Sequence, residues 1–272
     1  MKLVDLFEDK KNFLTGYKLA LHAWEKINAD CKPFLEQSKG IPMFRGVAPK
    51  YVGGERAEYA TFEKRSVRTD RIPRSSAHDA FFNWSFNAVM EREFKIKNIR
   101  YSSLFATGSE AQAVYYGDLH FIFPIGNFDT IWSKRVNDSY EEINLLNYMR
   151  HEFENRAAYA EWVDENLEPY FERLVKEGNF DYTVLKTARN EHINKMYVWL
   201  DKTLIKEYGY VKNAALDYVL KSGNEIFIPA PCEYYSVSAR YLAEAVGTGA
   251  NEEGTYIYKE FFRHMQEYKA PR

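Results

Sequence analysis

The chain has 272 residues, of which 46% are hydrophobic and 28% are charged, and its formal net charge is −2. This composition predicts a globular protein with a sizeable core, and it excludes both the signature of disorder and a basic field for generic binding to nucleic-acid phosphates. The two cysteines, Cys31 and Cys232, are too few for a disulfide framework or a zinc cluster, and no run of about 18 apolar residues predicts a membrane span.

The first part of the chain reads as helices followed by a short strand. Apolar residues recur at helical spacing from Leu3 to Ile27, which predicts one or two amphipathic helices. The stretch "GIPMFRG" (residues 40–46) predicts a short strand that enters a tight turn. Ser75 or Ser76 can then cap a helix that runs to about Glu93.

Three consecutive segments follow in the order strand, helix, strand. "IRYSSLFATG" (99–108) predicts a strand, "SEAQAVYYG" (109–117) a short helix closed by its glycine, and "LHFIFPIG" (119–126) a second strand. From Ser139 to Lys221 the pattern becomes helical and charged. We interpret 139–221 as a helical insertion, either a solvated bundle or a surface that docks a target protein.

The end of the chain predicts short strands and one small helix. Strands are expected at 225–228 and 234–237, a helix around 238–245, a glycine loop, and a final strand around 255–258. Because helices separate groups of strands, the fold class is α+β. We expect a single domain over 1–272 that carries the insertion.

Two stretches contain residues of known functional motifs but not the full pattern of those motifs. "GTGANEEG" (247–254) lacks both the preceding strand and the glycine spacing of a dinucleotide fingerprint, so it predicts a loop. "HEFEN" (151–155) lacks the second histidine of a zinc protease helix, and the six histidines are scattered. The sequence therefore predicts no metal site, and His78 and His120 are expected to be structural.

Three separated pieces carry groups that could bind a ligand together. Arg45, followed by Gly46 at a strand end, offers a planar charged fork to a phosphate, although an ordinary ion pair is equally possible. Strand alternation puts Ser103, Phe105 and Thr107 on one face. The third piece is "GNEIFIP" (223–229), in which Glu225 stands directly before an apolar run that ends in proline.

In their order and local sequence these pieces resemble the ADP-ribosyltransferases. In that family an arginine lies in a "YRG"-like first strand, matched here by "FRG" (44–46), and the catalytic glutamate opens a later strand, matched by Glu225. A phage-encoded branch of the superfamily is similar in further motifs. These are "R-x-D-R-x-P-R" (68–74), "F-x-T-G" (105–108), "YG" (116–117) and "FPIG" (123–126).

The resemblance implies an ADP-ribosyltransferase-like split antiparallel sheet and a mono-ADP-ribosyltransferase that uses NAD as a substrate and no metal. Glu225 would stabilise the ribose cation, Arg45 would hold a phosphate, and Ser103 or Thr107 would orient the glutamate. The residues expected to bind NAD are Arg45, Gly46, Arg71, Ser102, Ser103, Phe105, Thr107, Tyr116 and Phe123.

Two departures from the family pattern leave alternatives open. The hydroxyl triplet of the family is replaced either by Ser102 and Ser103 or by residues 106–108, and Gly223 stands where many members that modify arginine carry Gln or Glu. The acceptor residue therefore stays open. The phage-like resemblance implies a host protein as acceptor, and a nucleic acid is the alternative. Two other readings are an NAD glycohydrolase and a non-catalytic, virion-packaged protein. The absence of a signal peptide pattern favours the cytoplasm, that of the host for a phage protein.

Overall fold

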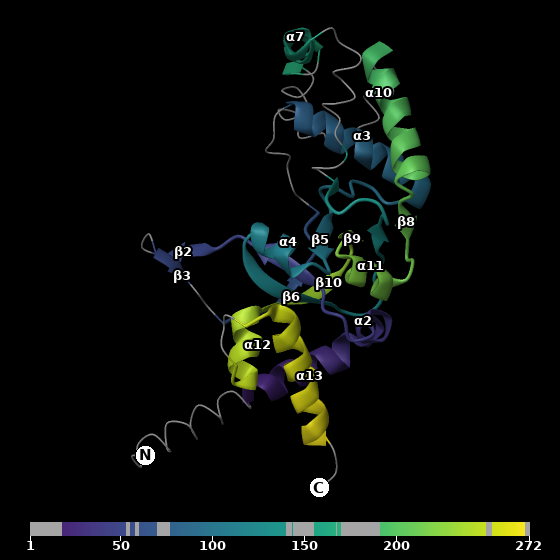
Figure 1. Ribbon diagram of the computed structural model, residues 1–272. Helices are drawn as coiled ribbons and strands as arrows, with labels where there is room; N and C mark the ends of the chain where they lie inside the picture. Colours follow the sequence, from purple (N-terminus) through teal and green to yellow (C-terminus); the bar gives the residue numbers. More distant parts are fainter. Residues whose placement is uncertain are drawn as a thin grey trace. The chain divides into compact units, whose positions relative to one another are not determined.

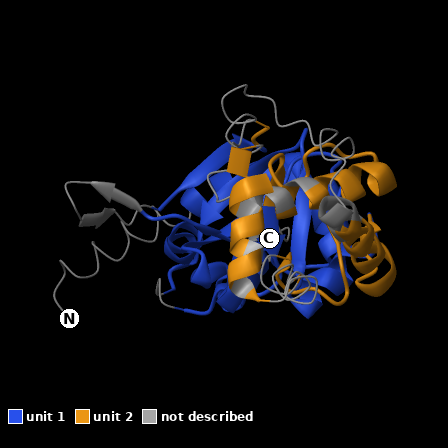
Figure 2. Ribbon diagram, turned by 90° about the horizontal axis from the view of Figure 1, so that it is seen from above, with its two compact units in different colours: residues 1–67, 105–130, 213–272 blue, residues 68–104, 131–212 orange. Residues whose placement is uncertain are grey.

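The computed structural model describes residues 18–52, 55–57, 60–69, 77–139, 143, 155–166, 168–169, 191–248 and 252–269. The chain divides into two compact units, drawn in blue and orange in Figure 2. Unit 1 comprises Met1–Val67, Phe105–Thr130 and Asn213–Arg272, and unit 2 comprises Arg68–Leu104 and Ile131–Lys212. The predicted insertion, 139–221, falls mainly in unit 2, which also includes residues 68–104.

Unit 1 is built on an antiparallel sheet (Figure 1), and this mixture of helix and strand confirms the α+β class. Its strands lie in the order β4-β10-β6-β1-β5-β9. They are β1 (Phe44–Val47), β4 (Phe62–Ser66), β5 (Ser103–Thr107), β6 (Asp118–Pro124), β9 (Glu225–Pro229) and β10 (Glu233–Ser238). A separate hairpin pairs β2 (Lys50–Val52) with β3 (Glu55–Ala57).

The register of the central strands defines two faces of this sheet. Phe44 of β1 lies opposite both Thr107 of β5 and Phe121 of β6, whereas Arg45 lies opposite His120. Since side chains alternate along a strand, one face carries Phe44, Phe121 and Phe123, and we call it the aromatic face. The other face carries Arg45, His120 and Ser236, and we call it the polar face.

Helices cover the aromatic face and form the core of unit 1 with it. They are the helix over residues 18–30, α2 (Lys32–Ser38), α12 (Ala239–Val246) and α13 (Gly254–Lys269). The ring of Phe123 stacks on Tyr258 of α13 at 6.0 Å and meets Phe34 of α2 edge-on at 5.8 Å. Burial of aromatic rings in such contacts is a main source of folding free energy.

Two short helices flank the strands that carry the expected site. Helix α4 (Glu110–Tyr115) begins after Ser109, whose hydroxyl accepts the N–H of Gln112, as in an ordinary N-cap. Helix α11 (Leu216–Ser222) ends at Gly223, which has a φ of 75° and so turns the chain into β9. Each helix therefore leads directly to, or from, a strand end.

Unit 2 is mainly helical. Its described helices are α3 (Ala77–Phe94), α7 (Arg156–Asn166), α10 (Glu191–Lys202) and the π-helix η1 (Thr203–Glu207), and β7 (Ile131–Trp132) pairs with β8 (Val211–Lys212). Arg100 ties this unit together, because its guanidinium hydrogen-bonds Asn83 at 2.9 Å and Ser139 at 2.5 Å and lies near two phenylalanine rings of α3.

Most predicted elements are confirmed to within a few residues, and one is wrong. The expected strand around 255–258 lies inside α13. Ile257 and Phe261, four residues apart, are both fully buried, so one helical face enters the core there. The predicted helix before residue 18, Ser75 and Ser76 lie outside the described residues.

Candidate functional site

The expected site residues of β1, β5 and β9 lie at one end of the sheet. These strands are neighbours, and their antiparallel order brings the start of β1, the end of β5 and the start of β9 together. Arg45, Thr107 and Glu225 occupy those three positions. Residues from three separate parts of the sequence are thereby gathered at one sheet end.

The three side chains are not all on the same face. Phe44 lies opposite Thr107, so alternation puts Arg45 on the polar face and Thr107 on the aromatic face. The rings of Phe105 and Phe227 are 4.9 Å apart, which places Glu225, two residues before Phe227, on the side of Thr107. A ligand that touches both Arg45 and Glu225 would have to pass around the end of the sheet.

Thr107 is occupied by bonds within the protein. Its Oγ1 lies 2.6 Å from the carbonyl oxygen of Gly223, to which it donates, and it accepts the N–H of Ser109 at 3.0 Å. The side-chain oxygen of Gln112 lies 2.9 Å away. A hydroxyl has one proton to donate, so Thr107 acts as a positioning residue for the turn before β9.

The other two candidate hydroxyls also face the protein. Ser102 Oγ lies 2.9 Å from the carbonyl oxygens of Lys97 and Asn98, and it stabilises the turn before β5. Ser103 is fully buried, and its hydroxyl has no hydrogen-bond partner among the described residues. The expected contact of Ser102 and Ser103 with a ligand does not fit these positions.

The aromatic candidates differ in exposure. Phe123 is fully buried against Tyr258, so the expectation that its ring stacks on nicotinamide is wrong. Phe105 is half-buried and packs on Phe227. Tyr116 is 53% exposed and meets Tyr115 edge-on at 5.2 Å. Tyr116 thus keeps a ring face that a ligand can reach.

Two further candidates stand apart. A Cβ on Gly46 would approach the carbonyl oxygen of Ala113 to 2.2 Å, so this glycine allows α4 to pack closely on β1. This packing explains the glycine at position 46, and the expected approach of NAD to its backbone is not needed to explain it. Arg71 lies outside the described residues.

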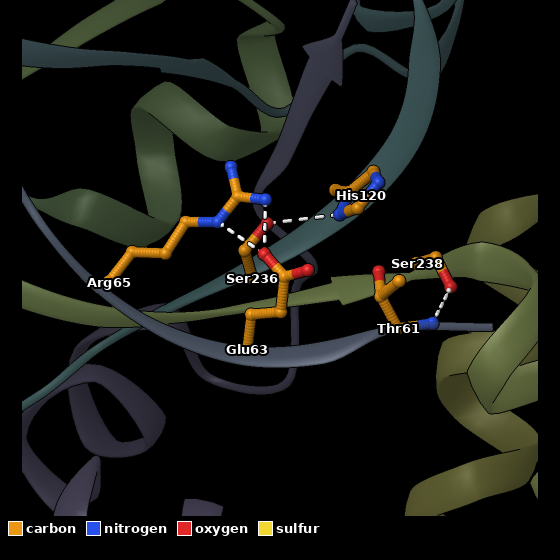
Figure 3. A network of polar contacts seen from close by, with 6 residues as sticks. All are labelled: Thr61, Glu63, Arg65, His120, Ser236 and Ser238. Atoms are coloured by element: carbon orange, nitrogen blue, oxygen red, sulfur yellow. Dashed lines mark hydrogen bonds and ion pairs between the residues drawn. The ribbon is translucent and has the colours of Figure 1, made fainter. Parts of the chain in front are cut away.

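A polar cluster on the polar face was not predicted from the sequence (Figure 3). Arg65 Nε of β4 donates to Glu63 at 2.7 Å, and the same carboxylate oxygen pairs with Nη2. His120 Nδ1 lies 2.9 Å from Ser236 Oγ of β10. Alternation in "LHFIFP" places His120 on the face opposite Phe121 and Phe123, but the identity of its neighbours depends on strand register.

The environment of His120 keeps its imidazole neutral. The residue is 6% exposed, and burial, reinforced by the charges of Arg65 and Arg45, lowers its pKa to about 4. Asp118 and Glu63 act in the opposite direction. At neutral pH the side chain is therefore an uncharged hydrogen-bonding group between two arginines.

Comparisons with known proteins gave no match, whether to a family model, to a curated protein or to a solved structure. Among the described residues, no group of three His, Cys, Asp or Glu side chains could hold a metal ion. Within the same part of the chain, none of the helices combines the length and apolar character needed to cross a bilayer.

Proposed function

We propose that the protein is a mono-ADP-ribosyltransferase that moves ADP-ribose from NAD to a protein acceptor and releases nicotinamide, on an ADP-ribosyltransferase-like fold. The observation that supports this proposal is the meeting of the strand ends that carry Arg45, Thr107 and Glu225 at one end of the sheet. The resemblance of "FRG" and "NEIFIPAP" to the family motifs supports the same roles.

In this reaction the bond between ribose C1′ and the pyridinium nitrogen breaks, and its electron pair leaves with neutral nicotinamide. The ribose becomes positively charged, and the carboxylate of Glu225 stabilises that charge and accepts a hydrogen bond from the 2′-hydroxyl. An acceptor nucleophile then bonds to C1′ and loses its proton. Glu225 is half-buried at the mouth of β9, where a fixed carboxylate can meet the sugar.

The other residues have supporting roles in this proposal. Arg45, permanently charged, binds a phosphate of NAD. Thr107 holds the turn at Gly223 and so fixes the start of β9. Tyr116 offers an exposed ring for stacking. Release of the protein into a host cell or packaging in a virion would both fit a phage-encoded member.

A second candidate is a binding protein without turnover. It is favoured by the hydroxyls, since Ser102 and Thr107 are engaged within the protein and Ser103 is buried. It is also favoured by the placement of Arg45 on the face opposite Thr107. Fold alone does not decide between a transferase and such a scaffold.

Incubation with NAD labelled on its adenylate phosphate, in the presence of a protein extract, tests these functions. Label bound covalently to protein is the expected result and identifies a transferase. Free ADP-ribose identifies an NAD glycohydrolase. Fully intact NAD, with purified protein at micromolar concentration, would overturn both catalytic functions and leave the binding protein.

A further inference from the structure

Two short segments of unit 1 pack directly against each other just before Glu225. The first is the turn 107–109, which joins β5 to α4, and the second is the segment 220–223, where α11 ends and the chain turns into β9. A Cβ on Gly108 would approach the carbonyl oxygen of Leu220 to 1.7 Å. The two backbones therefore touch, and the first turn has no room for a side chain at its centre.

Both backbone polar groups of Gly223 are engaged in this contact region. Its N–H donates to the carbonyl oxygen of Val219 at 3.1 Å, and its carbonyl oxygen accepts the hydroxyl proton of Thr107 at 2.6 Å. Glu225 follows two residues later, as the first residue of β9. The orientation of the Gly223 carbonyl therefore sets the direction in which the chain enters β9.

The hydroxyl of Thr107 has three polar neighbours and only one proton. The carbonyl oxygen of Gly223 can only accept and takes this proton, while the N–H of Ser109 donates to the hydroxyl at 3.0 Å. The third neighbour is the side-chain amide of Gln112, whose oxygen lies 2.9 Å away and would need the same proton again. A half-turn of the amide, which fills the same volume, places Nε2 there, and its N–H can then donate to the threonine oxygen.

We propose that Gln112 is a positioning residue for Glu225 and that it acts through Thr107. Its Nε2–H donates to the Thr107 hydroxyl, and that hydroxyl donates to the carbonyl oxygen of Gly223. Hydrogen bonds linked in this way polarise and strengthen one another. The effect of Gln112 on catalysis rests on the proposed function, whereas the two linked hydrogen bonds do not depend on NAD.

The position of Gln112 on α4 suits it to this role. Its backbone N–H donates to the hydroxyl of Ser109 at 3.3 Å, in the N-cap of the helix. Its side chain is half-buried. Because the helix start already fixes the backbone of Gln112, only its side-chain rotamers remain to be ordered when the amide binds Thr107.

NMR on the intact protein tests the orientation of the Gln112 amide without a variant and without NAD. We expect nuclear Overhauser effects from the Nε2 protons of Gln112 to the β proton and the methyl group of Thr107. If the Nε2 protons are assigned and show no such effects, the amide oxygen faces the threonine and the proposal is wrong.

The Gln112→Glu variant tests the direction of the hydrogen bonds with nearly the same side-chain shape. At pH 8 the carboxylate can only accept, so it competes with Gly223 for the single proton of Thr107. We expect kcat for NAD turnover to fall by about 10- to 100-fold, the cost of slightly misplacing a catalytic group, while KM for NAD changes by less than about threefold.

Val114→Ala is the matched control for this variant, because Val114 lies on the same helix and is 52% exposed. It should leave kcat and KM unchanged. A wild-type kcat in Gln112→Glu would overturn the role of Gln112.

A double-mutant cycle separates the two linked hydrogen bonds from a general effect on α4. In a Thr107→Val background the link is already broken, so Gln112→Met should cause no further loss of kcat or of stability to urea. Losses that simply add in free energy would contradict the proposal. The urea cycle needs no NAD. Coupled stabilities in a protein that does not turn over NAD would refute the proposed function and support the linked bonds, whereas turnover without coupling would refute the role of Gln112 alone.

Discussion

Thr107 Oγ1 donates to the carbonyl oxygen of Gly223 across 2.6 Å, and this bond links the end of β5 to the turn that begins β9. The two residues are 116 positions apart in the chain. The same hydroxyl accepts the N–H of Ser109 at the start of α4. One threonine thus joins a strand end, a helix start and the turn that precedes Glu225.

The Thr107→Val variant removes this hydroxyl while it keeps the side-chain shape. We expect the free energy of unfolding to fall by about 1–3 kcal/mol, because a part-buried carbonyl and a part-buried N–H lose their partner. NAD turnover should fall as well, since the start of β9 is less well fixed. Thr107→Ser, which retains the hydroxyl, is the control for urea unfolding and turnover. A valine variant as stable as the serine variant would show that the bond contributes nothing.

The Glu225→Gln variant tests the central catalytic role. Loss of one group that stabilises charge in a transition state costs about 10²–10³-fold in rate, so turnover should fall by that amount while NAD binding remains. Glu233→Gln is the matched control, since Glu233 also opens a strand but pairs at the surface with Lys64 at 2.8 Å. Turnover of Glu225→Gln within tenfold of wild type excludes the assignment.

Two aromatic substitutions separate the core from the surface. Phe123→Ala should lower the free energy of unfolding by about 3–5 kcal/mol, because the ring is fully buried against Tyr258. Tyr116→Ala should change it by less than about 0.5 kcal/mol, since the ring is half exposed. NAD affinity should fall only in the tyrosine variant. Thermal unfolding and equilibrium NAD binding measure both effects.

The buried imidazole of His120 makes stability depend on pH. Its pKa is about 4 in the folded protein and 6.5 in the unfolded chain, so the unfolded chain takes up the proton first as pH falls. The contribution of neutral His120 to the free energy of unfolding is complete above pH 6.5. It is lost as pH falls from 6.5 to 4, and the total loss is about 3 kcal/mol. Between these two pH values, the free energy of unfolding measured in urea should fall less in the His120→Asn variant than in the wild type. An identical slope in both proteins would contradict this account.

Local sequence predicted the strands well, because their boundaries are marked by residues that stop regular structure. The proline-rich stretch after Ile228 ends β9, whereas β1 continues past Gly46 to Val47. The segment around 255–258 was misleading because alternating aromatic and β-branched residues favour strands locally. Burial of Ile257 and Phe261 on one helix face determined the outcome.

The site could be predicted only in part. Local sequence placed Glu225 at the start of a strand, which the structure bears out, whereas it placed Arg45 at the end of a strand and β1 begins at Phe44. It could not assign faces, since a shift of one residue in register moves every side chain to the other side of a sheet. The neighbours of His120 on β4 and β10 could not be predicted either, because local sequence patterns do not show which strands pair.

The close fit between α4 and β1 limits how this sequence can evolve. A Cβ on Gly46 would approach Ala113 O to 2.2 Å, and one on Gly117 would approach Val47 O to 2.4 Å. Neither glycine can drift to a larger residue unless the helix moves away. Substitution of either glycine would therefore also displace the exposed side chains at the end of α4, which are Val114, Tyr115 and Tyr116.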